Sequence, residues 1–215
     1  MYKLIIFDLD GTLLDTSRTI RSVLNDSLKK FSLPPISLEK TIEFVGNGAK
    51  KLVERAVGGQ RKELCESVYT DYSKNFANCN NSLTSLYSGA SEALRRFGKA
   101  GVILAIVTNK PEQATLRVYE EFLSEYGFSA VVGQSEHAPL KPNPASTLKI
   151  IQDCGLKHEE CLFVGDGETD VQTAANAGIK CVSALWGFRT REQLRTAGAT
   201  LFAKNFNELE KIVME

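Results

Sequence analysis

The sequence predicts an α/β fold in which a doubly wound parallel sheet carries an inserted all-helical domain. Short apolar runs alternate with longer helical patterns through most of the 215 residues, and this alternation is typical of right-handed β–α–β crossovers. The segment from about Asp15 to Leu86 is the exception, because it carries three helical patterns and no convincing strand. We therefore expect a core of residues 1–15 and 86–215 and a helical domain of residues 16–85.

Six short runs have the composition of strands. Val102–Val107 is almost unbroken in its apolar character, as expected for a parallel strand that is covered on both faces. The others are Lys3–Phe7, Phe128–Val132, Cys161–Val164, Lys180–Ser183 and Leu201–Ala203. Open sheets of this kind bind ligands beyond the carboxyl ends of their strands, so the residues that follow each run are candidates for a site.

Helical patterns fill the connections. Proline at 111 and at 144 is suited to a first helical turn, and Gly178 is placed to end a helix. In the core the predicted helices are Gly89–Lys99, Pro111–Tyr126, Asn143 to about Asp153 and Glu168–Asn176. In the insertion they are Ser17–Phe31, Asn47–Val57 and Gln60–Asn78, with a break at Leu33–Pro34–Pro35.

Composition and charge argue against two kinds of partner. Lys+Arg and Asp+Glu number 26 each, so the formal net charge is zero, whereas nucleic-acid-binding proteins usually carry a basic excess. The apolar run Leu4–Phe7 is broken by Asp8 and is too short for a signal peptide or a membrane span. We therefore expect a cytoplasmic protein that binds neither nucleic acid nor membrane.

Two aspartates follow the first predicted strand directly. Asp8 and Asp10 point to the same side if the strand continues, and Gly11 permits a tight turn after them. Close carboxylates repel unless a cation lies beside them or one of them takes a proton. A nucleophilic carboxylate beside an acid/base carboxylate fits this arrangement. The alternative is a solvated junction between a strand and a turn.

Polar residues also follow the second and third strands. Thr108 and Asn109 could hold a phosphoryl oxygen, although a turn that caps the next helix explains them better when they are taken alone. Lys141 lies in a loop stiffened by Pro142 and Pro144, and a fixed ammonium can neutralise charge on a transferring phosphoryl group. The alternative for Lys141 is an ordinary surface lysine.

The fourth strand is followed by acidic residues that open a helix. Asp166 and Asp170 would reach the same sheet edge as Asp8 and Asp10. At roughly 5 Å and an effective dielectric constant of about 20, each like-charged pair costs about 3 kcal/mol. Oxygen ligands favour a hard cation such as Mg²⁺, which would offset this repulsion. The alternative is an acidic helical turn that interacts with the helix dipole.

These motifs occur in order, each after a strand, and together they resemble the haloacid dehalogenase superfamily along the whole chain. The motifs are DLDGTLLDT, VTNK, LKPNP, and VGDGETD followed by AANAG. The resemblance implies a Rossmann-like core with a helical cap inserted after the first strand, where residues 16–85 fall. It also implies phosphate-ester chemistry, because dehalogenases and phosphonatases lack the second aspartate, Asp10, in that role.

The resemblance assigns a role to each core residue. Asp8 would attack phosphorus and form an aspartyl-phosphate, and Asp10 would protonate the leaving oxygen and later activate water. Thr108, Asn109 and Lys141 would contact phosphoryl oxygens. Positioning and charge stabilisation of this kind account for most of the catalysis in phosphoryl transfer.

The same resemblance implies one Mg²⁺ ion as cofactor. Asp8, Asp166 and the carbonyl oxygen of Asp10 would bind the ion, and Asp170 would support its ligand shell. The expected partner is a small-molecule phosphate ester, and the expected oligomeric state is a monomer or a weak homodimer.

The inserted segment is similar to the caps of phosphoglycolate phosphatases. Gly46, Asn47 and Gly48 could let the backbone approach a small substrate at the start of a helix, where an anion is favoured. Lys50 follows closely, and we expect Lys50 or Arg55 to help select an anionic substrate. The alternative is a glycine-rich turn between helices with no ligand.

The leading interpretation is a phosphatase acting on 2-phosphoglycolate or another small phosphomonoester. A phosphosugar mutase of the β-phosphoglucomutase type would share the same core residues, and hydrolysis of inorganic pyrophosphate is a third possibility. A phosphate-sensing or scaffold protein on the same fold is the non-enzymatic alternative.

Overall fold

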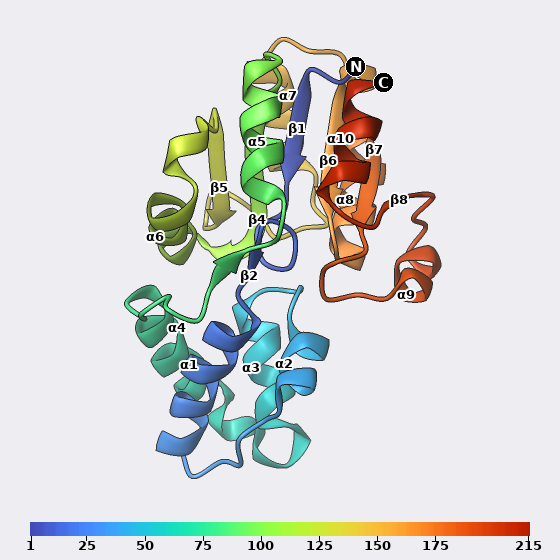
Figure 1. Cartoon of the computed structure of the whole chain (residues 1–215). Coiled ribbons are helices and arrows are strands. Elements are labelled where there is room, and N and C mark those ends of the chain that lie inside the picture. The colour runs from blue at the N-terminus through green and yellow to red at the C-terminus, as the bar shows by residue number, and fades with distance from the viewer.

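The computed structural model describes all 215 residues and confirms the predicted α/β class (Figure 1). A parallel sheet of six strands has the order β5-β4-β1-β6-β7-β8. Its strands are β1 (Leu4–Phe7), β4 (Ile103–Pro111), β5 (Ala130–Gln134), β6 (Cys161–Gly165), β7 (Lys180–Ala184) and β8 (Leu201–Ala203). Counted along the chain, these core strands follow the order of a Rossmann-type sheet, whose direction of winding reverses between β1 and β6.

Helices cover both faces of the sheet, and alternate residues of each central strand bury against them. Ile5 and Phe7 of β1 pack with α5, α6 and α10, whereas Leu4 and Ile6 pack with α7 and α8, as the two-residue period of a strand requires. These helices are α5 (Ala90–Lys99), α6 (Glu112–Phe122), α7 (Ala145–Asp153), α8 (Glu168–Ala177) and α10 (Phe206–Met214). A shorter helix, α9 (Arg191–Thr196), joins β7 to β8.

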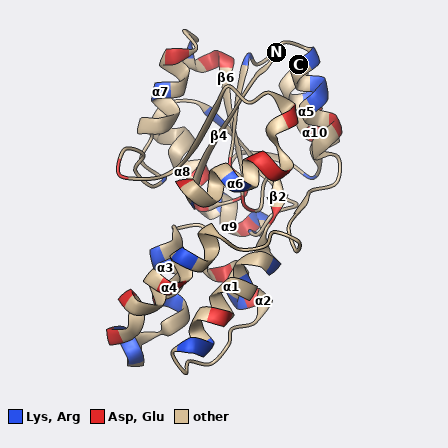
Figure 2. Cartoon of the chain, turned by 90° about the vertical axis from the view of Figure 1, so that its left-hand side faces the viewer, with Lys and Arg blue, Asp and Glu red and all other residues tan.

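The inserted segment packs around a hydrophobic core of its own. Leu24, Val53 and Tyr72 are nearly inaccessible to solvent within this core. The segment contains α1 (Ser17–Lys30), α2 (Leu38–Phe44), α3 (Ala49–Val57), the 3₁₀ helix η1 (Gly59–Leu64) and α4 (Cys65–Ala77). In Figure 1 these helices lie beyond the end of the sheet toward which the strand arrows point. Helices of the core and of the insertion carry charges of both signs (Figure 2).

The expectation of no strand between about Asp15 and Leu86 was wrong at its two edges. Two-residue strands, β2 (Leu14–Asp15) and β3 (Ser85–Leu86), pair antiparallel where the chain leaves and re-enters the core. Strands this short leave no periodic pattern in the sequence. We propose that residues 16–85 form a cap domain, and the β2–β3 ribbon at its boundary supports this division.

Three helices were not predicted. Helix α2 buries only Thr41, so it has no apolar stripe, although Ser37 caps it by accepting a hydrogen bond from the Lys40 backbone N–H. Helix α9 likewise buries only Leu194. Helix α10 was not predicted, although its signal in the sequence is clear. Asn205 caps it, and its apolar residues recur at helical spacing.

Two predicted helices of the insertion have different bounds. The chain begins α3 at Ala49, after Gly48 with a φ of 85°, a left-handed conformation that favours glycine. The predicted single helix Gln60–Asn78 is divided into η1 and α4, and η1 is itself kinked at Arg61, whose dihedral angles are not helical. No helix in the structure combines the length and the apolar character that crossing a membrane requires.

Candidate active site

Three carboxylates meet at the carboxyl edge of the sheet, next to the point where its winding reverses. One oxygen from each of Asp8, Asp166 and Asp170 lies within 4.8 Å of the others. Asp8 directly follows β1, and its backbone N–H donates to Val164 O at 2.9 Å. The other two residues come from the loop after β6 and from the first turn of α8. The sheet order therefore brings together residues that are more than 150 positions apart in the sequence.

Glycines make room for this crowding. Gly11 has a φ of 86°, and a Cβ at this position would collide with the Asp166 carboxylate. A Cβ at Gly165 would collide with the Asp170 carboxylate, and one at Gly187 would collide with Asp166. Asp166 and Asp170 can occupy these positions only because the three glycines lack a side chain.

Asp166 is fixed by two hydrogen bonds. Thr12 Oγ1 donates to Asp166 Oδ1 at 2.8 Å, and the Phe188 backbone N–H donates to Oδ2 at 2.7 Å. Burial, followed by the charges of Asp8 and Asp170, raises the pKa of Asp166 to about 8. The ionised form is therefore costly here without a compensating positive charge.

Lys141 provides part of that positive charge from within the cluster. Its Nζ lies 2.8 Å from Asp8 Oδ1 and 2.6 Å from Asp170 Oδ1, and its side chain is only 2% exposed. The lysine predicted to contact phosphate is therefore buried between the carboxylates and is not an ordinary surface lysine. Although burial lowers the pKa of Lys141, the charges of Asp170 and Asp8 outweigh it and raise the pKa overall.

The positive charge of Lys141 alone does not balance the three carboxylates of the cluster. Asp8 Oδ1 is buried and has no partner with hydrogen-bond geometry, despite its closeness to Lys141. Burial is the main cause that raises the pKa of Asp8 to about 6, against the lowering effect of Lys141. An unpartnered carboxylate oxygen in an acidic, all-oxygen cluster suits a hard divalent cation.

Both oxygens of Asp166 and both oxygens of Asp170 accept hydrogen bonds, so these contacts do not separate a direct ligand from a supporting residue. The roles of Asp8 and Asp166 as direct Mg²⁺ ligands and of Asp170 as a supporting residue therefore stay predictions from the resemblance. The Asp10 carboxylate lies outside the group of three, which leaves its carbonyl oxygen as the donor that the resemblance implies.

We expect Mg²⁺ to stabilise the protein more at pH 8 than at pH 5. Because folding raises the pKa of Asp8 to about 6 and that of Asp166 to about 8, their contribution to metal-free stability is fully present below about pH 4 and is lost as the pH rises through those values. At 100 times its Kd, Mg²⁺ would add about 2.7 kcal/mol to the free energy of unfolding, or a few degrees in Tm.

Thermal melts with Mg²⁺ and with a chelator, at pH 5 and pH 8, measure this difference. Asp166→Asn should abolish most of the Mg²⁺-dependent shift. An equal Mg²⁺-dependent shift in Tm at both pH values would contradict the expectation that Mg²⁺ relieves repulsion between the carboxylates.

Lys110 is a site residue that the sequence interpretation missed. Its Nζ lies 2.9 Å from Asp10 Oδ1 and 3.2 Å from Oδ2, and it also lies 4.3 Å from the centre of the Phe76 ring. Thr16 Oγ1 donates to the same Asp10 oxygen at 2.7 Å. The signal was present as the last letter of VTNK, but the strand was expected to end at Val107, the first residue of this motif, whereas β4 extends through Pro111.

Thr108 and Asn109 occupy the same sheet edge but differ in what they can offer a ligand. Both line the cavity described below. The Asn109 amide donates to Gly46 O at 2.9 Å and to Lys141 O at 3.2 Å, and its Oδ1 accepts from the Lys141 backbone N–H at 2.7 Å. The Asn109 side chain is therefore engaged with two loops, so direct contact with phosphate remains a prediction for Thr108 and for the backbone.

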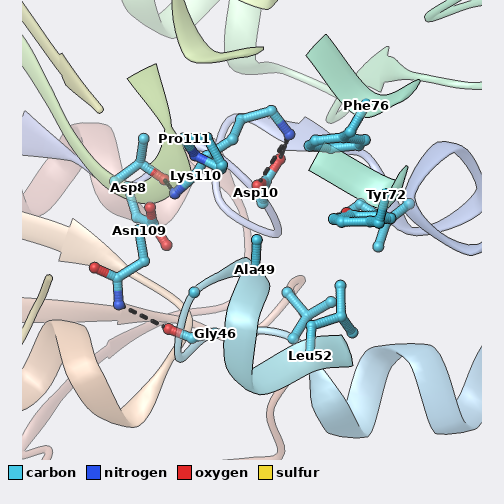
Figure 3. A pocket seen from close by; sticks show the side chains of 14 residues that line it. Asp8, Asp10, Gly46, Ala49, Leu52, Tyr72, Phe76, Asn109, Lys110 and Pro111 are labelled. Atoms are coloured by element: carbon cyan, nitrogen blue, oxygen red, sulfur yellow. Dashed lines mark hydrogen bonds and ion pairs between the residues drawn. The ribbon is translucent and has the colours of Figure 1, made fainter. Parts of the chain in front are cut away.

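A cavity of about 50 Å³ separates the core site from the helical segment (Figure 3). From the core it is lined by Asp8, Asp10, Thr108, Asn109, Lys110 and Pro111. From the helical segment it is lined by Ile20, Val45, Gly46, Gly48, Ala49, Leu52, Tyr72 and Phe76. No residue of the second group is charged, so the charges around this cavity all come from the core.

The predicted substrate-selecting residues are only partly placed at this cavity. Gly46 and Gly48 line it, whereas Asn47 and Lys50 do not. Lys50 is exposed and pairs with Glu66 at 3.1 Å. Arg55 donates to Asn47 Oδ1 and to a backbone carbonyl, which braces the loop. Neither Lys50 nor Arg55 lines this cavity, and each has a partner on the helical segment itself. The expectation that one of them helps to select an anionic substrate stays a prediction.

Matched substitutions distinguish the two lysines. Lys110→Met should lower kcat/KM by about 10- to 100-fold, because it removes a charge-assisted contact at the cavity. Lys50→Met should change kcat/KM by less than about twofold, as expected for an exposed pair. Phosphate-release kinetics, with melting curves to verify folding, make the comparison. A larger loss of kcat/KM from Lys50→Met than from Lys110→Met would indicate that Lys50 selects the substrate.

Comparison with known proteins agrees with this geometry. Residues 5–184 match the haloacid dehalogenase-like hydrolase family. The chain is 31% identical over 213 residues to phosphoglycolate phosphatase 1 of Pseudomonas aeruginosa, covering 96% of this chain and 78% of the relative. It is 30% identical over 224 residues to a phosphoglycolate phosphatase of Mannheimia succiniciproducens, covering 99% and 98% of the two chains.

Solved structures give the same result. A crystal structure from Lactobacillus delbrueckii subsp. bulgaricus has a TM-score of 0.92 at 28% identity, with 99% of this chain and 98% of that chain covered. A predicted phosphoglycolate phosphatase from Haemophilus somnus has a TM-score of 0.88 at 28% identity, with 98% and 97% covered. The match over residues 5–184 spans the four motifs and the acidic cluster that they build, and this chain belongs to the haloacid dehalogenase-like hydrolase family.

Proposed function

We propose that this enzyme hydrolyses small phosphomonoesters through an aspartyl-phosphate on Asp8, with 2-phosphoglycolate as its substrate. The observation that carries the chemistry is the position of Asp8, whose Oδ1 lies 2.8 Å from the Lys141 Nζ in an acidic cluster with Asp166 and Asp170. The relatives named as phosphoglycolate phosphatases support the substrate.

The reaction takes two displacements at phosphorus. In the first, an Asp8 carboxylate oxygen forms a bond to phosphorus as the ester P–O bond breaks, and Asp10 gives its proton to the leaving oxygen. In the second, Asp10 takes a proton from water as the water oxygen bonds to phosphorus. The bond between phosphorus and Asp8 then breaks, which releases inorganic phosphate and restores both carboxyl groups.

The surrounding residues hold these groups in place and balance their charge. Lys141 lies within reach of both Asp8 and Asp170, so its ammonium is fixed beside the phosphoryl group during transfer. Asp8, Asp166 and the Asp10 carbonyl would hold the Mg²⁺ ion, supported by Asp170. A bound Mg²⁺ ion supplies neutralisation of charge on the phosphoryl oxygens.

The cavity favours a short substrate with anionic character at both ends. It is small, and its two lysine neighbours, Lys110 and Lys141, both come from the core. Gly48 and Ala49 bring the start of helix α3 to the cavity wall, where the helix dipole favours a negative group. A substrate with a single methylene between the phosphate ester oxygen and the carboxylate suits a cavity this small, whereas the uncharged cap wall offers no partner for a second, distant phosphate.

Initial rates of inorganic phosphate release test the proposal directly. The panel is 2-phosphoglycolate, several sugar phosphates, pyrophosphate and an aryl phosphate, each with Mg²⁺ and with chelator. The expected result is a Mg²⁺-dependent kcat/KM that is highest for 2-phosphoglycolate. Isomerisation of a sugar phosphate without phosphate release would instead indicate a mutase, and equal weak rates would reject 2-phosphoglycolate as the preferred substrate.

A further inference from the structure

Arg189 joins the core to the cap at a point beside the active site. Its side chain is only 8% exposed and leaves the loop that follows β7. We propose that Arg189 is a positioning residue that clasps the cap loop Val45–Gly48 and thereby sets the shape of the substrate cavity. This proposal rests on the proposed phosphatase function, since it concerns how that substrate is held.

The guanidinium binds the carboxyl end of helix α2 and the residue after it. Arg189 Nη1 donates to Ile42 O at 2.8 Å, and Nη2 donates to Val45 O at 2.5 Å and, more weakly, to Glu43 O at 3.5 Å. The last carbonyls of a helix lack partners within it, and a cation is favoured at this end of the dipole. Arg189 therefore gives α2 a cap that comes from the other domain.

Glu168 orients the guanidinium from the core side. Arg189 Nε lies 3.0 Å from both Glu168 Oε1 and Oε2, which leaves the Nη atoms directed at the cap. The planar donor array of arginine serves a carboxylate and several carbonyls at once, an arrangement that lysine cannot reproduce fully.

The end of strand β4 and the loop after β5 also contact the same short segment. Asn109 Nδ2 donates to Gly46 O at 2.9 Å (Figure 3). Leu140 packs against Gly48, where an added Cβ would lie 3.0 Å from Leu140 Cδ2. The loop Val45–Gly48 is thus held from three places in the core: near the end of β4, after β5 and after β7. Arg189 and Asn109 each donate one hydrogen bond to this loop, and Arg189 alone also binds carbonyls of α2.

The clasped loop forms part of the cavity wall, and its core partners adjoin the acidic cluster. Val45, Gly46 and Gly48 all line the cavity. The residue before Arg189, Phe188, donates its backbone N–H to Asp166 Oδ2 at 2.7 Å. Loss of the clasp should therefore loosen the cap side of the cavity while leaving Asp8 and Lys141 in place.

Four variants test this role: Arg189→Ala, Arg189→Lys, Glu168→Gln and the control Arg195→Ala. Arg195 is an exposed arginine on helix α9. We expect Arg189→Ala to raise KM for 2-phosphoglycolate by about 10- to 100-fold, the size of effect for lost charge-assisted hydrogen bonds. Its kcat/KM for 4-nitrophenyl phosphate should change by less than about threefold, since this ester has a good leaving group and depends chiefly on the core. Arg189→Lys should recover part of the loss, Glu168→Gln should be intermediate, and Arg195→Ala should match wild type.

Small-angle scattering with Mg²⁺ and vanadate provides a readout that does not depend on turnover. The wild-type protein should become more compact with these ligands, whereas Arg189→Ala should remain more extended. The two proteins should have the same Tm, which would show that the variant is folded. An unchanged KM together with wild-type scattering would overturn the clasp. If wild type releases no phosphate from any ester, the proposed function fails, and the scattering comparison still decides the clasp.

Discussion

Asp8→Asn should lower kcat for 2-phosphoglycolate by at least about 10⁴-fold, because an amide cannot form the acyl-phosphate bond. Loss of the nucleophile removes the first displacement altogether, so higher substrate or Mg²⁺ concentrations should not restore the rate. Phosphate release by the purified variant, measured with a sensitive coupled assay, gives the result.

The same substitution should leave the fold intact or stabilise it. Asp8 contributes to the repulsion that raises the pKa of Asp166, so a neutral amide removes part of that cost. An unchanged or higher Tm in the metal-free variant would separate loss of chemistry from loss of structure. Activity within tenfold of wild type, from a sample free of wild-type protein, would contradict the assignment of the nucleophile.

Asp10→Asn should separate the two displacements. With 2-phosphoglycolate, kcat should fall by about 10²- to 10⁴-fold, because the alkoxide leaving group needs a proton. With 4-nitrophenyl phosphate, the first displacement needs little help and the second still lacks its base. We therefore expect a burst of nitrophenolate equal to the enzyme concentration, followed by slow turnover, in rapid-mixing absorbance measurements.

The control for this variant is Asp26→Asn, which removes an exposed carboxylate from helix α1 and should keep wild-type kinetics with both substrates. Equal losses with both esters and no burst would place Asp10 outside proton transfer. In that case its contacts with Lys110 and Thr16 would be its main contribution.

The parallel sheet and the acidic cluster could be predicted from the sequence because their signals are local. Each predicted strand of the sheet was found, since buried parallel strands are continuous apolar runs. The residues that follow these strands were expected to share one edge, and the structure brings Asp8, Asp166 and Asp170 together there. No long-range information was needed beyond the rule that parallel strands end on the same side.

The cap could not be predicted to the same depth, because its part in the site depends on packing. Lys50 occupies a plausible position in the sequence, yet the helix directs it to Glu66 on the surface. Lys110 faces the cavity because β4 continues past the apolar run that marks it. Arg189 reaches α2 because the inserted helices pack against the sheet edge, and no spacing in the sequence predicts that contact.

Chemical trapping of the phosphoenzyme tests the central claim most directly. Enzyme mixed with 2-phosphoglycolate and Mg²⁺ is quenched within one turnover, treated with borohydride, digested and analysed by mass spectrometry. Borohydride reduces an acyl-phosphate to an alcohol, so we predict homoserine in place of Asp8 in wild type, and a greater amount in Asp10→Asn when 4-nitrophenyl phosphate, which needs no acid in the first displacement, replaces 2-phosphoglycolate. Two results would contradict the mechanism. One is unmodified Asp8 in both proteins while wild type keeps its full hydrolytic activity, and the other is homoserine at another aspartate.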